Sequence, residues 1–185
     1  MAQATRHPAE NADPQPGPPG EPPYEMAGRA EERAPVCDWQ DLSGWVVEGW
    51  EAEGWLYRSR ARKLYQREFS GKLVYRALGP IPALLVRPAR PTPIPEPWDA
   101  VNLWTWGNNW GWVPDSSTPP LQASAVVRDA TGAELEIPLG GLDYQYWFLM
   151  NGRRSAEQRA RVRRPLEFVG LRFTNGTNRE LRTVY

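Results

Sequence analysis

The chain has 185 residues, with 22 basic and 22 acidic side chains, 41% hydrophobic residues, 20 Pro, 16 Gly and 10 Trp. This length fits one domain plus a tail, and a net charge near zero provides no broad field to attract nucleic acid or an anionic membrane. The single Cys, Cys37, excludes an internal disulfide and a cysteine-cluster metal site, and the single His, His7, argues against a Ser/His/Asp or Cys/His catalytic arrangement.

Residues 1–36 predict a disordered, Pro-rich tail. They contain eight Pro, one aromatic residue, and six acidic residues against three Arg. Such a stretch has too little apolar surface to offset the entropy of ordering. It also lacks the apolar run of a secretory leader, and no transmembrane segment is evident in the chain. The compartment is therefore left open, and export is expected only if the natural start lies upstream.

From residue 37 to residue 185 the sequence predicts one all-β domain. Short apolar runs are separated by turn residues, which is typical of half-buried strands. About ten such strands over this length indicate a jelly-roll-like β-sandwich. We expect the strands at Gly44–Glu48, Gly54–Ser59, Gly71–Leu78, Ala83–Arg87, Asp99–Trp106, Leu121–Asp129, Glu134–Leu139, Tyr144–Met150, Phe168–Thr174 and Glu180–Tyr185.

The connections between these strands carry their own signals. Asp129–Gly132 and Asn175–Gly176 have the chemistry of tight hairpin turns, in which Gly or Asn accepts a positive φ. The prolines of Arg87–Pro97 predict an extended connector. Ser155–Arg164 is rich in Arg and lacks a wide apolar stripe, so it predicts a surface loop or one short helix.

Trp98–Trp112, with the sequence WDAVNLWTWGNNWGW, is the most informative segment for function. Read as a strand, it alternates between two different faces. Val101, Leu103 and Thr105 form a face of core character, while Asn102, Trp104 and Trp106 form the other. An exposed aromatic patch usually marks a contact site, and an indole offers a flat apolar surface with one N–H donor.

This segment therefore predicts a sugar-binding face, on which indoles stack against sugar rings and amides bind hydroxyl groups. The candidate residues are Asn102, Trp104, Trp106, Asn108, Asn109, Trp110 and Trp112. Two alternatives stay open: the indoles pack within the domain, or they form an interface with another domain or subunit. For the second aromatic group, Tyr144–Met150, alternation predicts a strand that is covered on both faces. Trp39, Trp45, Trp50 and Trp55 are interpreted as core and edge packing.

Several short motifs resemble known families. DLSGW (Asp41–Trp45), FSGKLVYR (Phe69–Arg76) and WDAVNLWTWGNN (Trp98–Asn109) resemble strands of the galactose-binding-like β-sandwich modules attached to bacterial glycoside hydrolases. Leu121–Trp147 is similar to a segment of bacterial flagellar-filament sheath proteins. The first resemblance implies a non-catalytic carbohydrate-binding module, an accessory unit of a larger carbohydrate-active protein that binds a polysaccharide or other glycan beside a catalytic domain.

The resemblances also imply alternatives and a metal. The second one implies a structural or assembly domain that uses its Trp-rich surface for contact between domains or subunits. Galactose-binding-like modules often hold a structural Ca²⁺, for which Asp38 and Asp41 are candidate ligands from one end of the domain, although solvated carboxylates are the alternative. No cofactor is required, and neither nucleic acid nor a membrane is an expected partner. An enzyme is the least favoured hypothesis, because the carboxylates mostly fall on outward strand positions or in turns.

Overall fold

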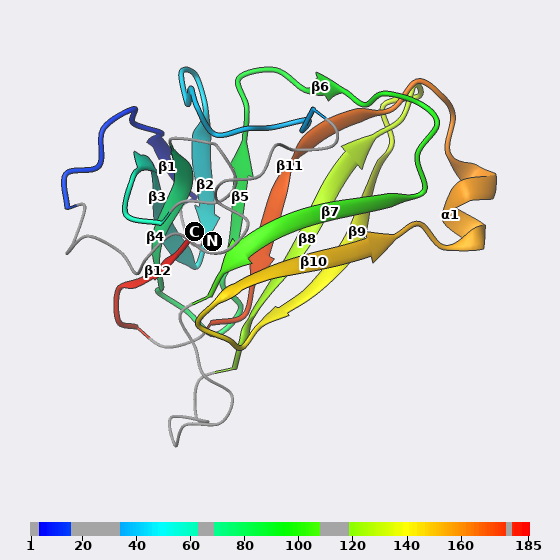
Figure 1. Cartoon of the computed structure of the whole chain (residues 1–185). Coiled ribbons are helices and arrows are strands. Elements are labelled where there is room, and N and C mark those ends of the chain that lie inside the picture. The colour runs from blue at the N-terminus through cyan, green and yellow to red at the C-terminus, as the bar shows by residue number, and fades with distance from the viewer. Residues whose placement is uncertain (1–3, 16–33, 63–68, 108–118, 177–178) are drawn as a thin grey trace.

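The protein is a two-layered β-sandwich in the computed structural model, which describes residues 4–15, 34–62, 69–107, 119–176 and 179–185 (Figure 1). One layer is a seven-stranded sheet with the order β1-β2-β5-β11-β8-β9 and with β6 beside β11. All the pairings in this layer are antiparallel. Its strands are β1 (Thr5–Pro8), β2 (Val46–Trp50), β5 (Ala83–Arg87), β6 (Thr92–Pro93), β8 (Leu121–Arg128), β9 (Glu134–Leu142) and β11 (Glu167–Thr174).

The opposite layer consists of two smaller sheets. One has the order β12-β4-β3, with β3 (Ala52–Ser59), β4 (Ser70–Ala77) and β12 (Arg182–Val184). The other pairs β7 (Ala100–Trp106) with β10 (Trp147–Arg153). Glycines allow the layers to approach closely. A Cβ on Gly54 of β3 would lie 3.1 Å from Val47, and a Cβ on Gly152 of β10 would lie 2.8 Å from Leu139.

The core between the layers is built by alternation along the strands. In β8, Leu121, Ala123, Ala125 and Val127 point inward and are buried. They join one continuous apolar cluster to which both layers contribute. Because strand side chains alternate with a period of two, the apolar residues of each strand share the face that meets the other layer.

The predicted all-β sandwich is confirmed, and each predicted strand has a counterpart within a few residues. The segment predicted as a surface loop or one short helix contains the helix α1 (Ala156–Arg161), which has no buried residues and begins at a capping box formed by Ser155 and Gln158. In the described ranges, no helix is both long and apolar enough to cross a bilayer.

Residues 4–15 differ from the predicted disordered tail. Thr5–Pro8 form β1, which pairs with β2, and the Asn11 side chain accepts a hydrogen bond from the Leu42 amide. Asp13 forms an ion pair with Lys72 on β4, with both side chains more than nine-tenths buried. The prediction of disorder was wrong for residues 4–15 because composition does not reveal their partners, which lie on the distant strands β2 and β4. Residues 1–3 and 16–33 lie outside the described residues.

Two further predictions need correction. Asn175 and Gly176 have positive φ as expected, but they do not close a hairpin, because β11 pairs with β5, β6 and β8 while β12 pairs with β4 in the other layer. The strand at residues 144–150 is not covered on both faces: Phe148 and Leu149 are 46% and 38% exposed. The β7–β10 sheet packs against β9 on one side, and Leu149 lies opposite Trp104 on its outer face. The turn at Asp129–Gly132 does join β8 to β9, as predicted.

Candidate binding site beside strand β7

The two faces of β7 differ as the sequence predicts. Val101 and Leu103 pack against the core and Thr105 is buried, where its hydroxyl shares a hydrogen bond with the Tyr144 hydroxyl. On the alternate positions, Asn102 is exposed and Trp104 is half-buried. This alternation directs Asn102 and Trp104 away from the packed side of the strand.

Strand β10 extends this outer face. In the antiparallel register, Asn102 pairs with Asn151 and Trp104 pairs with Leu149, and such cross-strand partners point to the same side of a sheet. The Asn151 amide nitrogen donates a hydrogen bond of 2.5 Å to the Asn102 side-chain oxygen. The face therefore has a polar amide pair directly beside an indole and an aliphatic side chain.

Trp106, the third predicted stacking residue, is covered by the protein itself. The Arg62 guanidinium lies 4.1 Å from the centroid of the Trp106 ring, an arrangement stabilised by the attraction of a cation to an aromatic face. Its other neighbour is Trp147, 6.1 Å away in an edge-to-face arrangement. Trp106 thus closes one end of the outer face. A sugar could stack on the Trp106 ring only if it displaced the Arg62 guanidinium.

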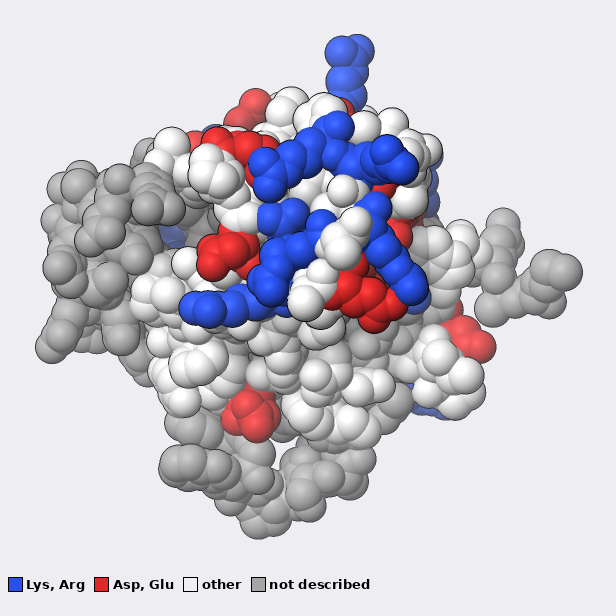
Figure 2. All heavy atoms as spheres, turned by 90° about the vertical axis from the view of Figure 1, so that its right-hand side faces the viewer, with Lys and Arg blue, Asp and Glu red and all other residues white. Residues whose placement is uncertain are grey.

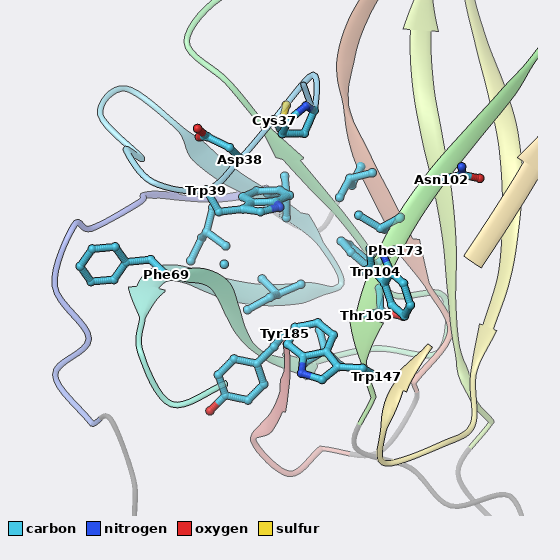
Figure 3. A pocket seen from close by; sticks show the side chains of 18 residues that line it. Cys37, Asp38, Trp39, Phe69, Asn102, Trp104, Thr105, Trp147, Phe173 and Tyr185 are labelled. Atoms are coloured by element: carbon cyan, nitrogen blue, oxygen red, sulfur yellow. The ribbon is translucent and has the colours of Figure 1, made fainter. Parts of the chain in front are cut away.

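A cavity of about 170 Å³ lies between β7 and the three-stranded sheet (Figure 3). The backbones of Trp106 and Tyr185 exchange two hydrogen bonds, of 2.7 and 3.0 Å, which join β7 to the end of β12. Away from this junction the pairing does not continue in the described residues, so a gap opens between the two sheets. The lining is mainly aromatic and aliphatic and includes Leu56, Leu73, Val86, Leu103, Phe173 and Val184 together with Trp39, Phe69, Trp104, Trp147 and Tyr185.

Trp39 enters this cavity from the loop before β2. Its φ of 59° lies in the left-handed region, which is unusual for a bulky residue. Its indole packs against Gly71 of β4, where a Cβ would lie 3.0 Å from the ring, and its centroid is 5.0 Å from that of Trp45. The neighbouring Gln40 anchors the loop by donating to the Phe69 carbonyl. Sequence reasoning assigned Trp39 to packing, and no local signal could have placed it opposite Trp104.

The cavity lining also includes one thiol and one carboxylate. Burial raises the pKa of the Cys37 thiol to about 12, with the Asp38 charge as a smaller cause, so the thiol is protonated and unreactive at neutral pH. Asp38 is the one acidic side chain among the described lining residues. A lone carboxylate does not form the acid pair that glycoside hydrolysis needs.

The predicted calcium ligands serve as turn caps. One Asp41 oxygen accepts hydrogen bonds from the amide and hydroxyl of Ser43 and from the Asn11 side chain. These bonds, those from Ser43 first, lower the Asp41 pKa to about 2. Asp38 accepts from the Gln40 amide. Within the described ranges, no three His, Cys, Asp or Glu side chains gather as a metal site, and the structural Ca²⁺ expected at Asp38 and Asp41 stays a prediction.

Asn108, Asn109, Trp110 and Trp112 lie outside the described residues. Of the predicted recognition residues, Asn102 and Trp104 line the cavity, whereas Trp106 is covered by Arg62. The structure adds Trp39 from a loop, Trp147 from β10 and Tyr185 from the residue after β12, three segments far apart in the sequence.

Comparisons with known proteins bear on the fold. No family model matches the sequence, and no curated protein matches it. A solved structure from work on "the promiscuous specificity of the carbohydrate-binding modules from the beta-sandwich super family" matches with a TM-score of 0.53 and 12% identity. The match covers 78% of this chain but 55% of that one. Nothing in these comparisons supports the resemblance to flagellar sheath proteins. At this identity the likeness concerns architecture, and the fold is that of a carbohydrate-binding-module-like β-sandwich.

Proposed function

We propose that the protein is a non-catalytic carbohydrate-binding module that serves as an accessory unit of a larger carbohydrate-active protein. The observation that carries this proposal is the meeting of Asn102 and Trp104 with the Trp39 indole at one open, aromatic-lined cavity. The fold of the domain, which it shares with a carbohydrate-binding module, supports the same function.

The chemistry of this site suits a sugar. Indole rings offer flat apolar surfaces for the C–H faces of a sugar ring, and side-chain amides supply both donors and acceptors for hydroxyl groups. A cavity of about 150 Å³ is known to hold one benzene-sized ring, so the space of about 170 Å³ beside β7 suits a single ring or substituent of a longer glycan. The rest of the glycan would then lie along the outer face of β7 and β10.

Calorimetric titration with a panel of soluble polysaccharides tests this function. We expect Trp104→Ala and Trp39→Ala each to weaken binding of the recognised glycan about tenfold, the effect of losing roughly 1.5 kcal/mol of stacking. Trp50→Ala is the matched control, because Trp50 is 43% exposed at the end of β2 and does not line the cavity. It should bind like the parent protein. The proposal fails if no glycan binds, or if all three variants bind equally well.

A second candidate function, a domain for assembly, is favoured by the aromatic edge of β10. Tyr146 and Phe148 are 45% and 46% exposed, and their ring centroids lie 6.3 Å apart. Exposed apolar clusters of this kind can mark protein interfaces. Light scattering distinguishes the candidates: a dimer that Phe148→Lys converts to a monomer would favour assembly, whereas a monomer at all concentrations would exclude self-association.

A further inference from the structure

We propose that the glycan is anionic, a polysaccharide of uronic acids, and that Arg153 binds one of its carboxylates. This inference rests on the proposed glycan-binding function and names its substrate class. It follows from the arrangement of side chains along β10, where Leu149, Asn151 and Arg153 occupy alternate positions, and all three are exposed.

The strand register places these residues on one face. Arg153 pairs with Ala100, Asn151 with Asn102, and Leu149 with Trp104, whereas the intervening Met150 and Gly152 are buried. Alternate residues of a strand lie about 7 Å apart. The face thus changes over about 14 Å from an indole, through an amide pair, to a guanidinium. An extended glycan lying along it would meet stacking, hydroxyl-binding and carboxylate-binding groups in turn.

Arg153 belongs to a positively charged surface at the α1 end of the molecule. Figure 2 looks onto this end and shows Lys and Arg side chains gathered across it, with carboxylates between them. Three of the arginines form ion pairs: Arg128 with Glu134, Arg161 with Glu157, and Arg164 with Glu96.

Other arginines at this end form no ion pair with a described carboxylate. In the described part of the chain, no carboxylate lies within ion-pair distance of the Arg153, Arg159 or Arg163 side chains. The Arg159 guanidinium donates to the Arg154 carbonyl at 3.1 Å, which holds it beside the end of β10. Among the described residues, the guanidinium groups of Arg153, Arg159 and Arg163 therefore give the surface at the end of β10 a local excess of positive charge.

Buried Arg154 adds a further cation beneath this surface. It is 4% exposed, and its guanidinium lies 3.9 Å from the centroid of the Trp98 ring. Burial lowers its pKa from the ordinary value, yet an arginine stays charged at neutral pH. Glu96 is the carboxylate that most offsets this charge, and it is already paired with Arg164. An anion at the surface would relieve the repulsion among these cations.

The chemistry favours a carboxylated glycan over a nucleic acid. Guanidinium groups bind carboxylates in bidentate, charge-assisted hydrogen bonds. The amide pair next to Arg153, and Trp104 beyond it along the strands, suit a sugar. A nucleic-acid-binding domain normally carries a strong positive field, whereas this chain has equal numbers of basic and acidic residues.

Titration with polygalacturonate and alginate, and with fully methyl-esterified polygalacturonate as a neutral counterpart, tests the proposal. We expect at least one acidic polymer to bind more tightly than the ester, and its binding to weaken as salt is added. Arg153→Gln should weaken binding of that acidic polymer about tenfold and leave binding of the ester unchanged. Arg6→Gln is the matched control: Arg6 is an exposed cation on β1, and its loss changes the net charge equally.

The outcomes separate this inference from the proposed function. If neutral glycans bind through Trp104 and Arg153→Gln has no effect, the module binds sugars but the anionic specificity is wrong. If no glycan of either kind binds, both proposals fail together. Equal losses in Arg153→Gln and Arg6→Gln would indicate only a general charge effect, and tighter binding to a single-stranded oligonucleotide than to any glycan would also overturn the inference.

Discussion

The buried ion pair between Lys72 and Asp13 predicts a large loss of stability when either charge is removed. The Lys72 ammonium lies 3.0 Å from one Asp13 oxygen and 3.1 Å from the other, and it also donates to the Gln15 carbonyl. The second Asp13 oxygen accepts a bond of 2.7 Å from the Ser59 hydroxyl. The side chains are 7% and 6% exposed, so little water could replace a missing partner.

Lys72→Met leaves the Asp13 carboxylate buried without its cation, which typically costs about 3–5 kcal/mol. This is a substantial part of the roughly 5–15 kcal/mol by which domains are stable, and it corresponds to a fall in Tm of roughly 10 °C. Urea unfolding followed by tryptophan fluorescence measures the loss. The double variant, with Lys72→Met and Asp13→Asn together, should lose less free energy of unfolding than the two single variants lose in sum. The difference should be about 2 kcal/mol, because either single change already breaks the interaction between the two side chains.

Arg76→Met is the matched control. Arg76 lies on the same strand and pairs with Glu53, but it is 43% exposed, and such pairs are worth about 0–1 kcal/mol. The reasoning is refuted if Lys72→Met costs no more than Arg76→Met, or if the double variant shows the full sum. Either result would mean that residues 4–15 are not held against β4 in solution.

Other changes probe the cavity and a turn. Gly71→Ala, whose Cβ would lie 3.0 Å from the Trp39 ring, should displace this indole and weaken glycan binding severalfold with little loss of helix or strand signal in circular dichroism. Cys37, with its pKa raised to about 12, should hold about a thousandfold less thiolate at neutral pH than a thiol of pKa 9. Labelling by iodoacetamide should therefore be slow until the protein is unfolded; rapid labelling of the folded protein would contradict the burial. Hydrogen bonds, chiefly from the Thr131 side chain, lower the Asp129 pKa from 3.8 to about 2. The stability they confer is fully present above about pH 4 and is lost as the pH falls toward about 2, because the unfolded state binds the proton more tightly. When stability is measured as a function of pH, the Asp129→Asn variant should lack this part of the loss of stability in acid. If the variant loses as much stability in acid as the parent protein, the hydrogen bonds of Asp129 do not contribute to stability.

Local patterns in the sequence were sufficient for most of the fold. Period-two alternation depends on residues within one strand, so the strands and the inward direction of Val101 and Leu103 could be predicted. The same holds for the positive φ of Gly132 and of Asn175, which are properties of single residues. The outward direction of Asn102 and Trp104 followed from the same alternation.

Contacts between distant segments could not be predicted in this way. The sequence alone did not show that Arg62 covers Trp106, that Trp39 faces Trp104 across a cavity, or that Asp13 reaches Lys72. These contacts depend on which strands become neighbours and in what register, and on the loops that the register brings together. The amino-acid sequence by itself determined the strands and the direction of their side chains. Only the tertiary structure decided which indoles line the cavity and that Arg62 covers Trp106, because both depend on segments that are far apart in the sequence.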